Sequence, residues 1–119
     1  MKQNTNLQFT KTLIESILEK KGEEITEINL SKLGNTIVDR FFICHGNSTT
    51  QVEAIADNIE EKLHQHLSIH AKNIEGKQNA QWILLDYYDV IVHVFYEPVR
   101  RIYNLESLWA DGEIVNHKS

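Results

Sequence analysis

The chain has 119 residues, which is room for a single domain that buries roughly two-thirds of the surface its unfolded chain exposes. With 41% hydrophobic and 24% charged residues, one proline and five glycines, the composition excludes disordered, collagen-like and low-complexity classes. Twelve basic against seventeen acidic residues give a net charge of −5. This charge argues against coating of phosphate backbones, so we expect little direct nucleic-acid binding and a protein partner instead.

The single cysteine and the polar N-terminal segment indicate where the protein works. Cys44 lies in the hydrophobic run Phe-Phe-Ile-Cys and has no partner for an internal disulfide, which is typical of a reducing compartment. Residues 1–12 contain no apolar signal-peptide region, and no window approaches the ~20 apolar residues of a membrane helix. We therefore expect a cytoplasmic protein with no membrane contact.

Apolar spacing predicts a helix and two strands in the first part of the chain. Apolar residues recur at threes and fours over residues 7–18, and Thr5 or Asn6 can cap the start of this helix. A short strand is expected over residues 25–30. A second strand over residues 39–45 is apolar on both faces, which is typical of the interior of a sheet.

The best-defined element by its pattern is a helix that follows Gly46-Asn47, with Ser48 or Thr49 as its cap. Its apolar positions follow the 3.6-residue period: Val52, Ile55, Ala56, Ile59, Leu63 and Leu67. A short strand over residues 71–74 comes next. Strand, helix and strand together predict a right-handed crossover unit with parallel strands.

The last third predicts a hairpin and a terminal apolar patch. The strands 82–87 and 90–96 are separated by two residues and should pair antiparallel. Pro98 suits the first turn of a short helix, and Leu105, Leu108 and Trp109 form the patch. The whole predicts one α/β domain over residues 1–119, with a mixed sheet of about five strands flanked by helices, and with residues 1–4 and 112–119 frayed.

Two groups of residues could be mistaken for metal sites. Asp86 and Asp89 resemble a carboxylate pair, but residues three apart on a strand face opposite sides, so turn chemistry is the better interpretation. Of the histidines His64, His66 and His70, only the last two have the spacing that shares a helical face, and a solvated helix end explains them better. We predict no metal and no cofactor.

Other residues favour burial or an interface. Cys44 is expected to be inert core, and His93 a hydrogen-bonded core or interface histidine, because no nucleophile pattern accompanies it. Residues 81–113 combine six acids with both tryptophans, Trp82 and Trp109. Large aromatic residues beside carboxylates are typical of a surface that binds a basic protein, although either tryptophan could equally be core.

Six segments of the chain resemble the Iojap-related proteins, or ribosomal silencing factors, in the order of that family. No single segment is decisive, but together they span nearly the whole chain. The segments are residues 37–48 (Ile-Val-Asp-Arg-Phe-Phe-Ile-Cys-His-Gly-Asn-Ser), 51–57 (Gln-Val-Glu-Ala-Ile-Ala-Asp), 74–76 (Ile-Glu-Gly), 82–86 (Trp-Ile-Leu-Leu-Asp), 89–95 (Asp-Val-Ile-Val-His-Val-Phe) and 101–109 (Arg-Ile-Tyr-Asn-Leu-Glu-Ser-Leu-Trp).

The resemblance implies a domain that is similar in outline to nucleotidyltransferases but is not an enzyme. It implies binding to the large ribosomal subunit through ribosomal protein fourteen, a block on joining of the two subunits, repression of translation, and a weak homodimer when free. Organelle relatives are linked to assembly of the large subunit. On this basis, and from the aromatic and acidic character of the region, the expected partner-binding residues are Trp82, Asp86, Tyr88, Asp89, His93, Tyr103, Leu105, Leu108 and Trp109.

Three expectations remain for the structure and for experiment. Tyr88 stands where the family usually has glycine, so either the hairpin turn differs or the strand continues. The hairpin should supply a sheet surface or edge for a second copy. Trp82→Ala should retain near-normal melting and lose subunit binding. The alternative functions are a large-subunit assembly factor and a small nucleotidyltransferase-like enzyme.

Overall fold

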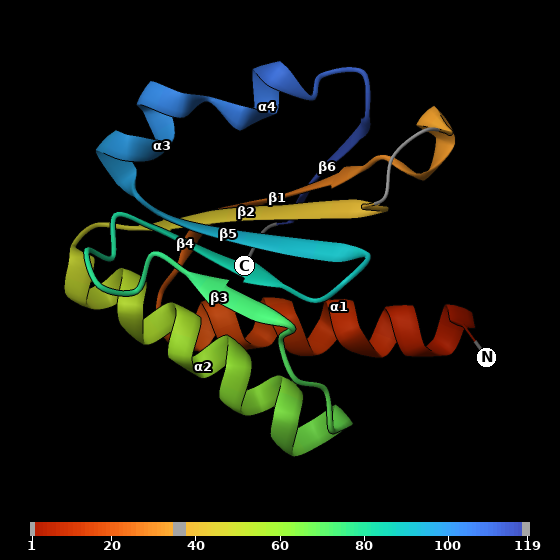
Figure 1. Cartoon of the computed structure of the whole chain (residues 1–119), viewed down its shortest axis with the longest axis horizontal. Helices are drawn as coiled ribbons and strands as arrows, with labels where there is room; N and C mark the ends of the chain where they lie inside the picture. The colour runs from red at the N-terminus through yellow and green to blue at the C-terminus, as the bar shows by residue number, and fades with distance from the viewer. Residues whose placement is uncertain (1, 35–37, 118–119) are drawn as a thin grey trace.

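The computed structural model describes residues 2–34 and 38–117, and the described part forms a six-stranded sheet with helices on both faces (Figure 1). Residues 1, 37, 118 and 119, for which expectations were stated above, lie outside it. The elements in chain order are α1 (Lys2–Glu19), β1 (Glu23–Asn29), the 3-10 helix η1 (Ser31–Leu33), β2 (Arg40–Gly46), α2 (Thr49–Leu67), β3 (Asn73–Glu75), β4 (Trp82–Asp86), β5 (Val90–Tyr96), α3 (Glu97–Tyr103), α4 (Leu105–Leu108) and β6 (Glu113–His117).

The sheet is mixed, with the strand order β3-β4-β5-β2-β1-β6. Strands β2 and β5 pair in parallel, and all other neighbours are antiparallel. It follows that β3 runs in the same direction as β2, so the crossover through α2 does connect parallel strands, with β4 and β5 lying between them. The α/β class, the hairpin of β4 and β5 and the interior position of β2 are all as predicted.

Helices α1 and α2 cover one face of the sheet (Figure 1). Helix α2 is capped by Ser48, whose hydroxyl accepts a hydrogen bond from the backbone N–H of Gln51 at 3.1 Å, as predicted. Helix α1 already begins at Lys2, so the predicted cap at Thr5 or Asn6 and the frayed residues 2–4 are wrong. The segment before Gly22 contains no glycine or proline, so no helix-breaking residue prevents α1 from extending to Lys2.

The C-terminal segment is a strand, so the prediction that residues 112–119 fray is wrong for the described residues up to 117. Strand β6 pairs antiparallel with β1, and Ile114 lies opposite Ile28. Strand β1 would otherwise expose a row of unpaired backbone groups at the edge of the sheet, and β6 satisfies them. This pairing raises the number of strands from the predicted five to six.

The turn between β4 and β5 retains its tight form although Tyr88 replaces the expected glycine. Tyr88 has a φ of +74°, and its backbone N–H donates to the Oδ1 of Asp86 at 2.8 Å. The side chain of Asp86 thus holds the backbone in a region that tyrosine rarely adopts. Neither expected alternative, a different turn or a continued strand, is what the structure shows.

The edge strands of the sheet are β3 and β6. The hairpin of β4 and β5 lies inside the sheet, because β3 pairs with β4 and β2 pairs with β5. The prediction that this hairpin provides an edge for a second copy is therefore wrong. Its face toward α3 and α4 is the part of the hairpin that a partner could reach.

Candidate protein-docking face

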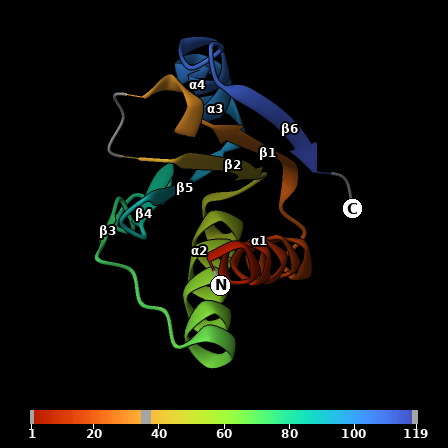
Figure 2. The same cartoon turned by 90° about the vertical axis from the view of Figure 1, so that its right-hand side faces the viewer.

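The face of the sheet opposite α1 and α2 is only partly covered. On this face β4 presents Trp82, Leu84 and Asp86, and β5 presents Ile91 and His93, with Leu84 opposite His93 and Asp86 opposite Ile91. All except His93 are half-buried. Figure 2 shows α3 and α4 above the middle of the sheet, and no helix covers β3 and β4 on this side. We call these five residues the open hairpin face.

Exposed apolar side chains of α3 and α4 lie on the same side of the sheet as the open hairpin face (Figure 1). Tyr103 and Leu108 are 55% and 71% exposed, and Ile102 is also exposed. Leu105 and Trp109 are half-buried and pack on a second hydrophobic core on this side of the sheet. A group of large, solvent-exposed apolar residues on the same side as such a face is typical of a protein-binding site. The open hairpin face together with residues 102–109 is called the docking face below.

Trp82 contacts both parts of the docking face, the hairpin and α3. Its ring stacks on Phe95 at a centroid distance of 4.9 Å and lies 4.7 Å from the ring of Tyr103, and its Nε1–H donates to the Nδ1 of His93 at 3.0 Å. Removal of this indole would leave a cavity in the second core and an unpaired histidine nitrogen. The expectation that Trp82→Ala melts almost normally is therefore not supported by the structure, since Trp82 serves the fold as well as the surface.

His93 is a buried, neutral histidine at the base of the docking face. Its Nδ1 accepts the bond from Trp82, so the proton of the neutral ring lies on Nε2, which is buried and has no hydrogen-bond partner among the described residues. Phe41 packs against the ring at 5.1 Å. Burial lowers the pKa of His93 to about 4, so the ring is neutral near pH 7. Of the two predicted roles, a hydrogen-bonded core histidine or an interface histidine, the free protein shows the core one.

The low pKa of His93 predicts a loss of stability in mild acid. In the unfolded chain the ring takes up a proton near its ordinary pKa of about 6.5, whereas the folded protein resists protonation down to about 4. Between these values the unfolded state binds more protons, so the free energy of unfolding falls as the pH falls, by up to about 1.4 kcal/mol per pH unit. Urea titrations of the native chain and of His93→Phe from pH 7 to pH 4 should show this slope in the native chain.

The variant isolates the contribution of His93 because the other buried histidine stays in place. Burial, followed by the charge of Arg100, also lowers the pKa of His45, so both proteins retain that part of the acid sensitivity. The difference between the two curves should grow as the pH falls below about 6.5. Parallel curves over the whole range would contradict the assignment.

Arg100 anchors α3 and α4 to the sheet. Its side chain is buried, and its Nη2 donates to the Oε2 of Glu106 at 3.0 Å and to the hydroxyl of Thr26 at 3.2 Å. Its Nη1 lies 2.9 Å from the Nδ1 of His45. One guanidinium thus joins α3 to α4, to β1 and to β2. The position of the exposed Tyr103 and Leu108 depends on this anchor.

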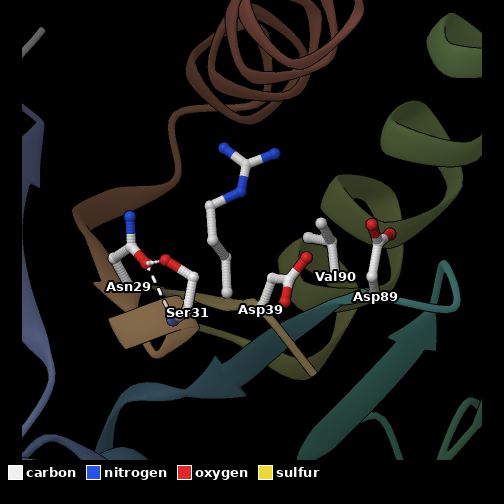
Figure 3. Close-up of a pocket in the computed structure, with 6 residues that line it drawn as sticks. Asn29, Ser31, Asp39, Asp89 and Val90 are labelled. Carbon is white, nitrogen blue, oxygen red and sulfur yellow. Dashed lines mark hydrogen bonds between the residues drawn. The ribbon is translucent and has the colours of Figure 1, made fainter. Parts of the chain in front are cut away.

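The turn end of the hairpin carries two acidic groups at the end of the sheet. Asp39 and Asp89 precede the parallel strands β2 and β5, and the N–H of Asp39 donates to the carbonyl oxygen of Asp89 at 2.7 Å. Both side chains are exposed and line an open hollow of about 120 Å³, together with Asn29 and Ser31 (Figure 3). The oxygen of Asn29 already accepts two bonds from Ser31. Arg40 and Val90, which face α1 and α2, complete the lining, so this open hollow is of mixed charge and is not an enclosed ligand site. The exposed pair Asp39 and Asp89 is called the acidic rim below.

The structure brings most of the predicted partner-binding residues to one side of the molecule. Trp82, Asp86, His93, Tyr103, Leu105, Leu108 and Trp109 lie on the docking face, and Tyr88 and Asp89 lie at the adjoining turn. His93 is too buried to touch a partner directly. Sequence reasoning missed Leu84 and Ile91. The two-residue alternation of β4 and β5 could have revealed both, because it places them on the same face as Trp82 and His93.

The residues considered for a metal site have other roles or lie apart. One oxygen of Asp86 holds the turn, and Asp89 faces the hollow shared with Asp39. The rings of His64 and His70 lie 4.2 Å apart between centroids, tilted by 39°, and no cluster of three or more metal-ligating side chains occurs in the described part of the chain. Cys44 is buried, and burial raises the pKa of its thiol to about 12, as expected for inert core. None of the described helices could cross a membrane.

Comparisons with known proteins agree with this fold. A family model described as ribosomal silencing factor during starvation matches residues 3–119. The ribosomal silencing factor RsfS of Halalkalibacterium halodurans is 40% identical over 111 residues, which cover 93% of each chain. A crystal structure of a Chromobacterium violaceum protein superposes with a TM-score of 0.80 at 34% identity, covering 87% of this chain and 85% of that one. A mouse protein named mitochondrial assembly of ribosomal large subunit protein 1 is 31% identical over 74 residues, 60% of this chain and 32% of that protein.

Proposed function

Because the chain belongs to the ribosomal silencing factor family, we propose that it represses translation in the cytoplasm by binding the large ribosomal subunit, without catalysis. In this proposal the docking face binds ribosomal protein fourteen of that subunit, and the bound protein stands in the way of the small subunit. The effect is steric, so it requires a specific surface and no reacting group.

The observation that carries the proposal is the apolar surface on one side of the sheet. Trp82, Leu84 and Ile91 are half-buried there, Tyr103 lies against Trp82, and Leu108 is exposed on α4 on the same side of the sheet. Apolar side chains of this kind favour binding because a partner removes them from water. Aromatic side chains contribute most to the binding free energy where the partner covers them completely. The acidic rim at the turn adds attraction for a basic partner, because Asp39 and Asp89 are both exposed.

The test is sedimentation of the purified protein with isolated large subunits through a density gradient, followed by addition of small subunits. We expect the protein to move with the large subunits and to lower the fraction of joined ribosomes. Small subunits alone serve as the control for unspecific binding. A protein that stays at the top of the gradient with large subunits would contradict the proposal.

The acidic rim predicts binding that depends on salt and on Asp89. Reversal of this exposed charge in Asp89→Lys should slow association several-fold at low salt, and the difference from the native chain should shrink at higher salt, where charges are screened beyond about 8 Å. Asp57→Lys, which changes an exposed charge on α2, is the matched control. Stopped-flow or surface-based association rates at two salt concentrations provide the measurement; equal rates for both variants would contradict a role of the rim.

A second candidate function is assembly of the large subunit. The mouse relative bears that function in its name, and an assembly factor could use the same docking face. Depletion of the protein separates the two functions: accumulation of immature large subunits favours assembly, whereas normal subunits with more joined ribosomes in starved cells favour silencing.

Calorimetry with nucleoside triphosphates and Mg²⁺ tests the remaining alternative, a nucleotidyltransferase-like enzyme, which should bind them specifically.

Self-association of the free protein belongs to the proposal as well. A weak homodimer was expected on the hairpin, but β3 and β2 flank that hairpin in the sheet. A second copy must therefore use the open face of the hairpin or another part of the surface, and not an edge of the hairpin.

A further inference from the structure

His45, in β2, makes a buried contact with Arg100 of α3. Its side chain is 2% exposed, and its Nδ1 lies 2.9 Å from the Nη1 of Arg100. A guanidinium can only donate hydrogen bonds, so the Nδ1 of His45 accepts this one and the proton of the neutral ring lies on Nε2. The bond between β2 and α3 therefore exists only while the ring is neutral.

Two carboxylates of β1 lie near the other nitrogen of this ring. The Nε2 of His45 is 3.8 Å from the Oε1 of Glu23 and 3.9 Å from the Oε2 of Glu24. Both side chains are about half exposed, so neither is fixed by tight packing. The imidazole thus has two sets of partners: a guanidinium that it binds when neutral, and carboxylates that attract it when it is charged.

The charged groups that act on His45 come from two elements. Arg100 and Arg101 belong to α3, and Glu23 and Glu24 belong to β1. Strand β5, the other neighbour of β2, places no charged residue opposite His45. Burial, followed by the charge of Arg100, lowers the pKa of His45 from its ordinary value of 6.5, and the two carboxylates act in the opposite direction. The ring is therefore neutral near pH 7 and takes up a proton in acid.

We propose that His45 is an acid switch for the docking face: protonation of Nδ1 from solvent breaks the bond to Arg100, the charged ring moves toward the two carboxylates, and α3 and α4 are released from the sheet. A hydrogen on Nδ1 would point at the N–H of Arg100, and two positive charges would lie 2.9 Å apart, so the contact cannot persist. Arg100 also bonds to Glu106 of α4, so its displacement affects both helices.

The size of the effect follows from the uptake of a single proton. A group that is protonated only in the released state shifts the ratio of released to closed protein by at most tenfold for each pH unit. The released fraction rises as the pH falls, because the ring binds its proton more tightly once it has left Arg100. The consequence for subunit binding rests on the proposed function, whereas the movement of α3 and α4 does not.

Fluorine NMR of the chain labelled with 5-fluorotryptophan tests the switch. Trp109 follows α4 directly, and its ring lies 5.4 Å from that of Phe41 in the sheet, so its signal reports on release. In the native chain this signal should move toward that of a solvated indole between pH 7.5 and pH 5.5. His45→Asn places an amide oxygen near the position of Nδ1 and cannot take up a proton, so its signal should stay in place.

Two further variants make the test specific. Glu24→Gln removes one of the carboxylates near the ring and should move the midpoint of the transition to lower pH. His93→Phe removes the other buried histidine and should retain the response of the native chain. If His45→Asn fails to fold, the shifted midpoint of Glu24→Gln decides the test. Far-UV circular dichroism over the same range should show an intact sheet.

Four outcomes would overturn the switch: a Trp109 signal that does not move in the native chain, an equal response in His45→Asn, an unchanged midpoint in Glu24→Gln, or loss of the sheet together with release. Gradient sedimentation with large subunits then tests the consequence for binding. We expect binding at pH 5.5 to be weaker for the native chain than for His45→Asn, and equal binding would overturn the link to the docking face. Absence of binding at pH 7.5 would contradict the proposed function, while the NMR result would still decide the switch.

Discussion

Replacement of Arg100 with alanine is expected to lower the free energy of unfolding by about 3–5 kcal/mol, which is the usual cost of leaving one member of a buried ion pair without its partner. The side chain is 2% exposed and bonds to Glu106, Thr26 and His45. Without the guanidinium, the carboxylate of Glu106 loses the only hydrogen-bond partner that it has among the described residues, and one of its oxygens is already buried without a hydrogen bond. Chemical denaturation with urea measures the effect.

The neighbouring arginine provides the matched control. Arg101 forms ion pairs with Glu24 at 2.7 Å and with Glu97 at 2.6 Å, but its side chain is half exposed. Exposed pairs are screened by water and contribute about 0–1 kcal/mol each, so Arg101→Ala should cost far less than Arg100→Ala. Equal losses in the two variants would contradict the distinction between a buried anchor and surface pairs.

The anchor also links stability to binding. Because Arg100 holds α3 and α4 against the sheet, a variant that still folds should present Tyr103 and Leu108 less accurately to the partner. Arg100→Lys retains the charge but cannot bond to Glu106, Thr26 and His45 together, since the ammonium lacks the planar fork of the guanidinium. We expect it to rescue only part of the lost stability.

The elements with strong local patterns were predictable from sequence, and those that depend on distant partners were not. Helix α2 has its cap at Ser48 and a regular apolar stripe, so local signals define both its start and its buried side. Strand β6 has only two apolar residues, Ile114 and Val115, between polar ones, which is too short a pattern to predict a strand. Its strand form depends on the free edge of β1, more than 80 positions earlier in the chain.

The site shows the same division. Alternation along β4 and β5 fixes which residues share the open hairpin face, so Trp82, Asp86 and His93 could be grouped from sequence. Burial of Arg100 could not be predicted, because it follows from contacts with Thr26 and His45, which are 74 and 55 positions away. An arginine in a short helix near the surface normally indicates a solvated side chain.

Leu108→Arg is expected to weaken binding to the large subunit by roughly 100-fold, a change of about 3 kcal/mol in binding free energy. The side chain is 71% exposed on α4, so the substitution removes almost no core contact and should change the free energy of unfolding by less than about 0.5 kcal/mol. In the complex, however, it places a charge in the apolar docking face. A basic partner also repels that charge, which adds to the cost of burying it.

Leu7→Arg makes the same chemical change at a matched position. Leu7 is 68% exposed on α1, which covers the opposite face of the sheet (Figure 1). The two variants therefore have the same charge and composition and differ only in which side of the molecule is altered. Gradient sedimentation with large subunits should show Leu7→Arg bound like the native chain and Leu108→Arg released. If both bind equally well, the partner does not cover α4, and if Leu7→Arg alone is released, the partner binds the helical layer of α1 and α2 and not the docking face.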